Sequence, residues 1–305
     1  MNEITLDYLK SLYSDIKLES VVKEEFDGLG LVNQTHYNSF ITYALKSAFY
    51  KQALSNHNVG AIITTKDVFK DNSLDSKTKT IILCEDPNKI FVSLHNHLYE
   101  ETTFYKSYVT YKIPGCCKIA RSAIVEDGVE MGKNCIIKDN VILKSGTVLG
   151  DNVVVREGAI IGPEISEERI IDNKYVAVRH DSFVSIENDV IVGVGTVIAR
   201  GLFGLPTRIG ERSRICDKVF IAHCGQVGYD SYIASGSNIS GSVTVGNKVW
   251  IGPGVLVTNG TTIGDNANVT LGAVVATNVQ PGARVAGHFA IDHVKFMKKW
   301  TKDRN

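Results

Sequence analysis

The stretch DKVFIAHCGQVG contains the residue best suited to chemistry, His223, two positions after Ile221. An imidazole with a pKa of about 6.5 accepts a proton at neutral pH, so it can act as a general base. Eighteen residues later, SNISGSVTVG contains Gly241, whose backbone N–H is not covered by a side chain. A base and an N–H that stabilises an oxyanion are the groups that acyl transfer needs. The alternative is that His223 is an ordinary surface histidine.

Both residues lie in a six-residue repeat. From Ile209 to Val275 every sixth residue is Ile or Val, twelve times without a miss, which exceeds ordinary local apolar patterning. The same register occurs earlier in the chain and is interrupted twice. The apolar positions are Ile119, Val125, Met131, Ile137, Leu143, Leu149, Val155 and Ile161, then Ile186, Val192 and Ile198, then Ile209, Ile215, Ile221, Val227, Ile233, Ile239, Val245, Ile251, Val257, Ile263, Val269 and Val275.

Small and turn-forming residues follow many of these positions, as in Gly264, Asp265 and Asn266. Such residues tolerate corners at which φ is positive. A period of six is a multiple of the strand period of two and not of the helical period of about 3.6. The pattern therefore predicts short strands that stack into a solenoid.

Residues 119–275 resemble the hexapeptide-repeat acyltransferases, whose repeats build a left-handed parallel β-helix with three units in each coil. The handedness and the three-unit coil are implied by this resemblance and not by the spacing. Given such coils, residues eighteen apart stack about 4.8 Å above one another. Gly241 would then lie directly above His223, with the histidine at an exposed corner of the coil.

VFIAHCGQVG and the glycine one coil later resemble UDP-3-O-acylglucosamine N-acyltransferase and its relatives that acylate nucleotide-linked amino sugars. The resemblance extends to the interruptions PEISEERIIDNKYVAVRHD and ARGLFGLPTRIG and to the closing AGHFAIDHVKF. It implies that His223 is the catalytic base and that Gly241 supplies the oxyanion N–H. It also implies a homotrimer with sites between neighbouring β-helices.

Residues 1–112 have a different texture, with few glycines. Helical spacing over residues 6–12 and 43–54 alternates with strand-like runs at 60–64 and 80–84. This alternation predicts a small α/β domain.

The boundary is predicted at the Pro114-Gly115 turn, with the β-helix over 113–282. The coil is expected to end at Gln280-Pro281-Gly282. Residues 283–305 are predicted to form a loop and a short basic helix over 293–302. The fold class is therefore mainly β, a left-handed parallel β-helix with a small N-terminal α/β domain and a short C-terminal helix.

The composition is that of a soluble intracellular protein, with 33 Lys plus Arg against 33 Asp plus Glu and 44% hydrophobic residues. It indicates no nucleic-acid partner. The N-terminal MNEITLDYLK is neither a signal peptide nor a membrane span, so a cytoplasmic location is expected. The cysteines lack CxxC pairs, which indicates reduced packing residues and no metal site. They are Cys84, Cys116, Cys117, Cys135, Cys216 and Cys224.

The resemblance implies that the N-terminal domain binds the nucleotide. Phe40 and Tyr43 are then candidates to stack on a pyrimidine, or they are simply core residues. In PNKIFVSLHNHLYEE, Ser93, His95 and His97 are candidates to contact the sugar or nucleotide, or they lie on a solvated face. Two histidines two residues apart do not share a helix face, so a helical metal site is not expected.

The two interruptions carry further candidates. His180, in the excursion from Pro163 to Ser185, could reach the site of an adjacent subunit or be a plain loop histidine. Five extra residues between Ile198 and Ile209 create a second loop, whose apolar side chains need cover from trimer packing or form a wall of the acyl pocket. These apolar residues are Leu202, Phe203, Leu205 and Pro206.

The chain ends soon after the repeat, whereas relatives that use acyl carrier protein extend a basic helical tail. Acyl-CoA is therefore the expected co-substrate, with an acyl carrier protein thioester as the alternative and no tightly bound cofactor. The turn AGHFAIDH resembles the pantetheine-side loop of the family, which makes Gly287 and His288 candidates for the donor contact.

The predicted function is N-acyl transfer from acyl-CoA to the amine of a dTDP- or UDP-linked amino-deoxy sugar in surface polysaccharide biosynthesis. UDP-3-O-acylglucosamine N-acyltransferase activity with acyl carrier protein is the enzymatic alternative. A γ-class carbonic anhydrase would need three histidine ligands, but only His223 lies on regular hexads. A non-catalytic scaffold would have uniform, uninterrupted hexads.

Overall fold

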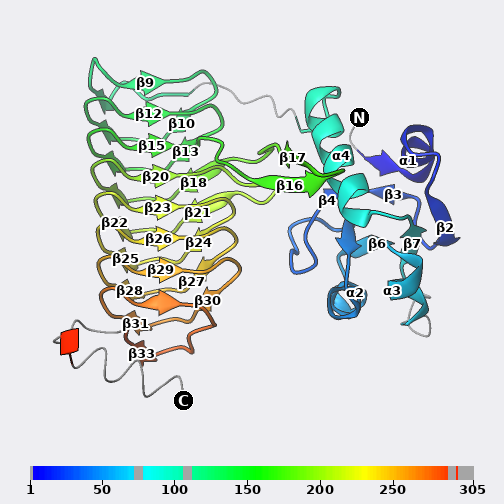
Figure 1. Ribbon diagram of the computed structural model, residues 1–305. Coiled ribbons are helices and arrows are strands. Elements are labelled where there is room, and N and C mark those ends of the chain that lie inside the picture. The colour runs from blue at the N-terminus through cyan, green and yellow to red at the C-terminus, as the bar shows by residue number, and fades with distance from the viewer. Residues whose placement is uncertain (1–2, 72–77, 106–111, 288–292, 295–305) are drawn as a thin grey trace.

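The computed structural model describes residues 3–71, 78–105, 112–287 and 293–294. An N-terminal α/β unit precedes a long parallel β-helix, from which a β-hairpin reaches toward that unit (Figure 1). The predicted fold class, mainly β with a left-handed hexapeptide β-helix, is confirmed. In the part of the chain that the structure describes, no helix is both long and apolar enough to span a bilayer. The predicted helix over 293–302 lies almost wholly outside the described residues.

Each hexad forms one short strand, and successive strands pass in turn to three parallel sheets, with seven, nine and eight strands in the described residues. The seven-stranded sheet contains β10 (Glu130–Met131), β13 (Val148–Leu149), β18 (Val184–Ile186), β21 (Thr207–Ile209), β24 (Gln226–Val227), β27 (Thr244–Val245) and β30 (Thr262–Ile263). The nine-stranded sheet contains β8 (Lys118–Ile119), β11 (Ile136–Ile137), β14 (Val154–Val155), β19 (Ile191–Val192), β22 (Arg214–Ile215), β25 (Tyr232–Ile233), β28 (Trp250–Ile251), β31 (Asn268–Val269) and β33 (Arg284–Val285). The eight-stranded sheet contains β9 (Ile124–Val125), β12 (Ile142–Leu143), β15 (Ile160–Ile161), β20 (Val197–Ile198), β23 (Phe220–Ile221), β26 (Asn238–Ile239), β29 (Leu256–Val257) and β32 (Val274–Val275).

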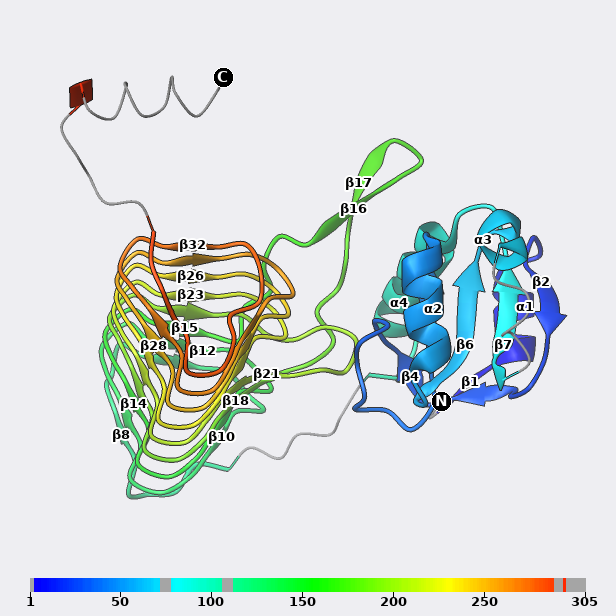
Figure 2. The same cartoon turned by 90° about the horizontal axis from the view of Figure 1, so that it is seen from below.

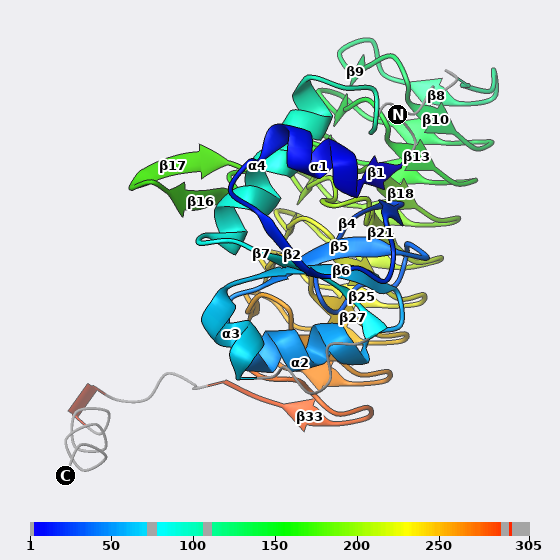
Figure 3. The ribbon, with the colours of Figure 1, turned by 90° about the vertical axis from the view of Figure 1, so that its right-hand side faces the viewer.

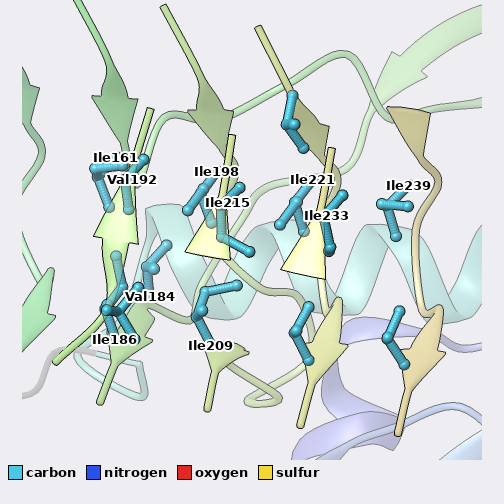
Figure 4. Packing of buried hydrophobic residues seen from close by; sticks show 14 of the residues in the cluster. Ile161, Val184, Ile186, Val192, Ile198, Ile209, Ile215, Ile221, Ile233 and Ile239 are labelled. Carbon is cyan, nitrogen blue, oxygen red and sulfur yellow. The ribbon is translucent and has the colours of Figure 1, made fainter. Parts of the chain in front are cut away.

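The inward residues of the hexads stack in register. Ile239 pairs with Ile221 on one side and with Val257 on the other, so residues eighteen apart do lie above one another. Across the two interruptions the pairing continues from Ile161 to Ile198 and from Ile198 to Ile221. Figure 4 shows these side chains packing along the inside of the coils. Each buried Ile or Val stabilises the fold by about 1.5–3 kcal/mol, and the repeat adds one such side chain in every hexad.

The coil continues beyond the turn at which the sequence analysis ended it. β33 follows Gln280-Pro281-Gly282 and pairs with β31 through Asn268 and Val269. The prediction that this turn ends the coil is therefore wrong. The proline and glycine form one more corner, because Gly282 has a φ of 70°.

The N-terminal unit is a five-stranded sheet in the order β2-β7-β6-β5-β4, with β2 antiparallel to β7 and the other pairs parallel. Its strands are β1 (Ile4–Thr5), β2 (Lys17–Ser20), β3 (Glu25–Phe26), β4 (Gly28–Leu29), β5 (Phe40–Ala44), β6 (Val59–Thr64) and β7 (Thr80–Leu83), where β1 and β3 form a separate antiparallel pair. Its helices are α1 (Leu6–Leu12), α2 (Ser47–Ser55), α3 (Lys66–Lys70) and α4 (Pro87–Glu100).

Alternate strand residues face opposite sides of this sheet, and helices cover both sides. Ile41, Ile63 and Ile82 pack with α1 and α4, whereas Ile62 and Ile81 pack with α2 and α3. The strand period of two thus divides the apolar residues into two cores.

The α/β unit and the β-helix are joined through the excursion, which forms the hairpin of β16 (Glu168–Ile171) and β17 (Lys174–Ala177). Figures 2 and 3 show that the α/β unit lies along one side of the coils, with α4 near the hairpin. Ile171 and Val178 belong to the same apolar cluster as the inner face of α4. The Asn96 side chain also donates a hydrogen bond to the Ala177 carbonyl (2.7 Å).

The second interruption is covered by the same unit. Leu202 and Phe203 are 2% and 3% exposed, and the Phe203 ring lies 5.1 Å from that of Phe91 and 4.6 Å from that of His95. The prediction that trimer packing covers these two side chains is therefore wrong. The N-terminal unit of the same chain buries them.

Candidate functional site

The unusual residues of the repeat gather at one corner of the β-helix. We call the corner between the eight-stranded and the seven-stranded sheet, which follows β15, β20, β23, β26 and β29, the insertion corner. The excursion leaves the coil there after Ile161, and the apolar loop leaves it after Ile198. The next two coils place His223 and Gly241 at the same corner.

His223 packs directly against Gly241. A Cβ on Gly241 would lie 2.4 Å from Cε1 and 2.5 Å from Nε2 of His223, so any larger residue would displace the imidazole. The His223 carbonyl accepts a hydrogen bond from the Ser242 N–H (2.9 Å). The His223 side chain is only 11% exposed. The prediction of an exposed corner residue is therefore wrong, since the excursion covers it.

The N–H of Gly241 is available as a donor. It donates no hydrogen bond to any residue that the structure describes, and Gly241 lines the same cavity as His223. Asn259, one coil further on, has its Oδ1 only 2.8 Å from where a Gly241 Cβ would lie, yet it accepts no hydrogen bond from this N–H. A free N–H beside a histidine is the arrangement that can stabilise an oxyanion.

Glu167, from the start of the excursion, supplies a carboxylate to this pair. Its Oε2 lies 3.4 Å from Nε2 of His223, and its Oε1 forms an ion pair with Nη1 of Arg169. Burial acts to raise the pKa of Glu167, but the contact with His223 and the charge of Arg169 lower it to about 2. Glu167 is therefore ionised throughout the neutral pH range. Burial opposes the charge of Arg169, but Glu167 and the Tyr43 hydroxyl raise its pKa.

His180 lies beside His223 of the same chain, with the ring centroids 6.0 Å apart and the rings edge to face. Its side chain is fully buried. Neither of its ring nitrogens, nor Nδ1 of His223, has a hydrogen-bond partner among the described residues. Burial first, and then the charge of His223, lower the pKa of His180 to about 4. His180 is therefore neutral at pH 7, and its neighbour is the histidine of its own chain.

A cavity of about 910 Å³ opens at the insertion corner. This volume is in the range of pockets that hold small-molecule ligands. Its apolar lining comes from both the α/β unit and the coils and consists of Leu31, Ile165, Leu202, Phe203, Phe220 and Ala222. The remaining lining residues are Glu164, Ser166, Glu167, Arg169, His223, Cys224, Asn238, Ser240, Gly241, Ser242 and Asn259.

The loop that lines the cavity is held by a buried carboxylate. Asp181 accepts hydrogen bonds from the N–H groups of Phe203 (2.5 Å) and Gly204 (2.6 Å). Phe203 has a φ of 54°, a left-handed conformation that costs an L-residue about 1–2 kcal/mol. His36 of the α/β unit contacts the Phe203 carbonyl through Nε2 (2.8 Å). The excursion and the α/β unit thus jointly fix this part of the lining.

Phe40 and Tyr43 lie on opposite faces of β5. Phe40 is fully buried in the core under α2 and does not line the cavity. Tyr43 is half-buried, packs on Phe91 with ring centroids 4.7 Å apart, and reaches Arg169 of the cavity lining. Of the two candidates for nucleotide binding, the structure brings Tyr43 next to the site.

The three candidates on α4 are not among the residues that line the cavity. His95 is fully buried, where its Nε2 contacts the Arg179 carbonyl (2.7 Å) and its Nδ1 contacts the Tyr105 hydroxyl (3.0 Å). His97 contacts the Tyr8 hydroxyl (2.9 Å), and Ser93 is half-buried on the same helix.

The two candidates for the donor contact are at the C-terminal end of the coils. Gly287 packs against the backbone of Gly272 and Ala273, and a Cβ there would lie 2.8 Å from Cα of Ala273. It is not part of the cavity lining. His288 lies outside the described residues.

Glu167 and Arg169 were not among the candidates that the sequence indicated. Glu167 lies just before β16 and Arg169 lies within it, in an excursion that has no hexad register. Their positions in the sequence therefore do not predict which way their side chains point. Their charged pairing two residues apart was a weak signal, because it is equally typical of a solvated strand. Among the described residues, no cluster of three or more His, Cys, Asp or Glu side chains is placed to hold a metal ion.

No protein-family model matches the chain. A UDP-3-O-acylglucosamine N-acyltransferase of Bordetella pertussis is 30% identical over 104 residues, which are 34% of this chain and 28% of that protein. The enzyme of that name from Caulobacter sp. (strain K31) is 33% identical over 120 residues, 39% of this chain and 34% of that protein. The similarity thus spans about a third of these relatives. It confirms the resemblance to hexapeptide-repeat acyltransferases that the hexads indicated.

Solved structures that match the chain include a UDP-N-acetylglucosamine acyltransferase from Campylobacter jejuni. It is 19% identical, with a TM-score of 0.46 over 61% of this chain and 80% of that chain. A perosamine N-acetyltransferase from Caulobacter crescentus, solved in complex with CoA and GDP-perosamine, is 12% identical. The match covers 85% of this chain and 99% of that chain, with a TM-score of 0.29.

Proposed function

We propose that this protein is an N-acyltransferase that moves an acyl group from acyl-CoA to the amine of a dTDP- or UDP-linked amino-deoxy sugar, for surface polysaccharide or glycan biosynthesis. The observation that carries the proposal is that His223 and the uncommitted N–H of Gly241 line one cavity. Relatives named UDP-3-O-acylglucosamine N-acyltransferase support an amino-sugar acceptor.

In this proposal the amine nitrogen attacks the thioester carbonyl carbon, and the Gly241 N–H stabilises the oxyanion that forms. His223 accepts the proton that the nitrogen loses. The C–S bond then breaks, and the thiolate leaves with a proton as the free thiol. A positioned base contributes about 10²–10⁴-fold to such a reaction, and holding the two substrates together contributes at least as much. In the rival, substrate-assisted route, the nitrogen passes its proton to the sulfur and His223 only orients the amine.

The chemistry of the neighbouring thiol, Cys224, favours direct transfer of the acyl group to the amine over transfer through an acyl-enzyme. Cys224 follows His223 and lines the cavity, so it could in principle form an acyl-enzyme. Burial, however, raises the pKa of its thiol to about 12, and its Sγ accepts a hydrogen bond from the Leu202 N–H (3.2 Å). A thiol that stays protonated at neutral pH is a poor nucleophile.

We assign the nucleotide to the N-terminal unit, which contributes Leu31 to the cavity lining and places Tyr43 beside Arg169. We further propose a homotrimer. The outward residues of the eight-stranded sheet form an apolar row that runs beside the cavity and that a neighbouring β-helix would cover. The row consists of Ile124, Ile142, Ile160, Val197, Phe220, Leu256 and Val274, interrupted by Asn238.

The test is a thiol-release assay on the purified protein, with a panel of nucleotide-linked amino sugars crossed with acetyl-CoA and longer acyl-CoAs. Thiol release that requires one particular amino sugar would support the proposal and identify the acceptor. Absence of turnover with every pair of substrates would contradict it and favour a binding scaffold.

UDP-3-O-acylglucosamine N-acyltransferase activity is the second candidate, because the relatives carry that name. It differs in its donor. A parallel arm of the assay with acyl carrier protein thioesters separates the two, since turnover only with the carrier protein and a 3-O-acylated UDP-glucosamine would establish the second candidate.

A further inference from the structure

We propose that the carboxylate of Glu167 binds the acceptor amine in its protonated form and thereby selects an amine over a hydroxyl group. The inference rests on acyl transfer at His223 as proposed above. It adds the residue that determines the class of acceptor.

The position of the carboxylate is fixed from two sides. Oε1 of Glu167 pairs with Arg169, and Oε2 lies 3.4 Å from Nε2 of His223. Glu167 lines the cavity and its side chain is 19% exposed. A carboxylate has about four lone-pair sites, so Oε2 retains capacity to accept a hydrogen bond from a group in the cavity. A cation held there is also within reach of the imidazole.

The charge of the cavity favours a cationic acceptor. Its described lining contains two carboxylates, Glu164 and Glu167, and one guanidinium, Arg169, which leaves a formal charge of −1 when His223 is neutral. The guanidinium is already paired with Glu167. The lining thus has a net formal charge of −1 and no unpaired cation for a phosphate group.

The proton balance is consistent with this arrangement. An alkyl amine has a pKa of about 10 and enters as an ammonium ion, with two more protons than the nitrogen of the amide product. Held between Glu167 and His223, it gives the first proton to the imidazole, which releases it to solvent. The neutral amine then attacks, the imidazole accepts the second proton as the amide forms, and this proton passes to the departing sulfur. The sum is ammonium plus thioester giving amide, thiol and one proton. A hydroxyl acceptor carries no charge for Glu167 to bind.

A positioning role is the competing explanation, in which Glu167 only orients His223. The two roles separate in binding measurements without an acyl donor. We would measure, by calorimetry at pH 7, the dissociation constants of UDP- and dTDP-linked amino sugars and of their hydroxyl counterparts, for the natural protein and for Glu167→Gln. The matched control is Glu168→Gln, which removes the same charge from an exposed neighbour that is not part of the cavity lining.

We expect Glu167→Gln to weaken binding of the amine by about 10- to 100-fold and to leave the hydroxyl counterpart within about 3-fold. Glu167→Asp, which keeps the charge, should retain most of the preference for the amine, and Glu168→Gln should change neither ligand. Equal losses for amine and hydroxyl would overturn the inference, as would an unchanged amine affinity in Glu167→Gln with a native melting temperature. Failure of every thiol-release assay would contradict the proposed function instead, because the binding comparison is made without a donor.

Discussion

The two corners that flank the seven-stranded sheet differ in the hydrogen bonds that their backbone N–H groups donate. At the corner that follows this sheet, here called the capped corner, a side chain one coil further on accepts a hydrogen bond from the backbone N–H. Asn247 caps Tyr229 (3.1 Å), and Asp265 in turn caps Asn247 (2.8 Å). At the insertion corner, Asn259 occupies the same register one coil beyond Gly241 but does not cap its N–H.

Within one repeat, the capped corner thus contributes to stability and the insertion corner contains the candidate catalytic groups. The capped corner repeats this side-chain-to-backbone hydrogen bond in several coils, as from the Lys133 N–H to Asp151 and from the Asp151 N–H to Asn188. The insertion corner replaces the pattern with a glycine, a histidine and two interruptions, and it leaves an N–H and ring nitrogens without partners among the described residues. Unsatisfied buried groups cost free energy, so two adjacent histidines with unpartnered ring nitrogens are a mark of function.

Replacing the proposed base, His223, should cause the largest loss of activity at the insertion corner. His223→Ala is expected to lower kcat by about 10²–10⁴-fold, because His223 is the only imidazole among the described residues of the cavity lining and is the proposed acceptor of the amine proton. The measurement is thiol release with the amino sugar found in the substrate panel, with circular dichroism to confirm the fold. Unchanged turnover with an unchanged KM would favour the substrate-assisted route.

Adding a side chain at Gly241 should have the second largest effect on activity. Gly241→Ala would place a Cβ 2.4 Å from the His223 ring, so we expect the imidazole to be displaced, turnover to fall at least about 10²-fold and stability to fall by about 1–3 kcal/mol. A double-mutant cycle with His223→Ala tests the cause. If the clash is with the ring, the alanine at position 241 should cost much less stability when position 223 is also alanine. Additive losses would show that the glycine is needed for another reason.

Much of this contrast could be predicted from the sequence, and the rest could not for physical reasons. A fixed period determines which side chains point inward, so the hexads predicted the core. The stacking of Gly241 on His223 was predicted from the three-unit coil that the family resemblance implied. Glu167 and His180 lie in an excursion without a period, where only tertiary contacts decide where a side chain points. The burial of His223 follows from the same excursion.

The N-terminal unit was predictable as α/β but not in its packing. Phe40 and Tyr43 differ by an odd number of strand positions, so one of them had to face away from the site. The sequence did not indicate which face of β5 is turned to the β-helix. The cover of Leu202 and Phe203 by α4 could not be predicted either, because it joins segments that are far apart in the chain.

The free energy of unfolding should fall at acidic pH because His180 is buried in its neutral form. The folded pKa of His180 is about 4, below the ordinary value of 6.5, so the unfolded chain binds this proton first as the pH falls. The resulting loss of stability begins below pH 6.5 and grows until pH 4, to at most about 3 kcal/mol. His180→Leu should flatten this part of the profile in urea unfolding at pH 7, 6 and 5. Parallel profiles for the two proteins would show that His180 is not buried in its neutral form.

The capped corner should respond in stability alone. Asn247→Ala removes the cap of Tyr229 and is expected to cost about 1 kcal/mol, by analogy with the loss of a helix cap, while kcat and KM remain unchanged. The measurement pairs urea unfolding with thiol release. A loss of turnover comparable to that of Gly241→Ala would contradict the division between the two corners.

The smallest effect should come from the thiol next to the base. Cys224 shares the insertion corner and has a φ of 58°, but its Sγ is engaged with the backbone of Leu202 and burial raises its pKa to about 12. Cys224→Ser keeps a donor and an acceptor at this place, so turnover should stay within about 3-fold of the natural protein. Intact-protein mass spectrometry after incubation with acyl-CoA alone should show no acyl adduct. An adduct that Cys224→Ser abolishes, together with lost turnover, would replace direct transfer with a covalent route and extend the chemistry of this corner to a second residue.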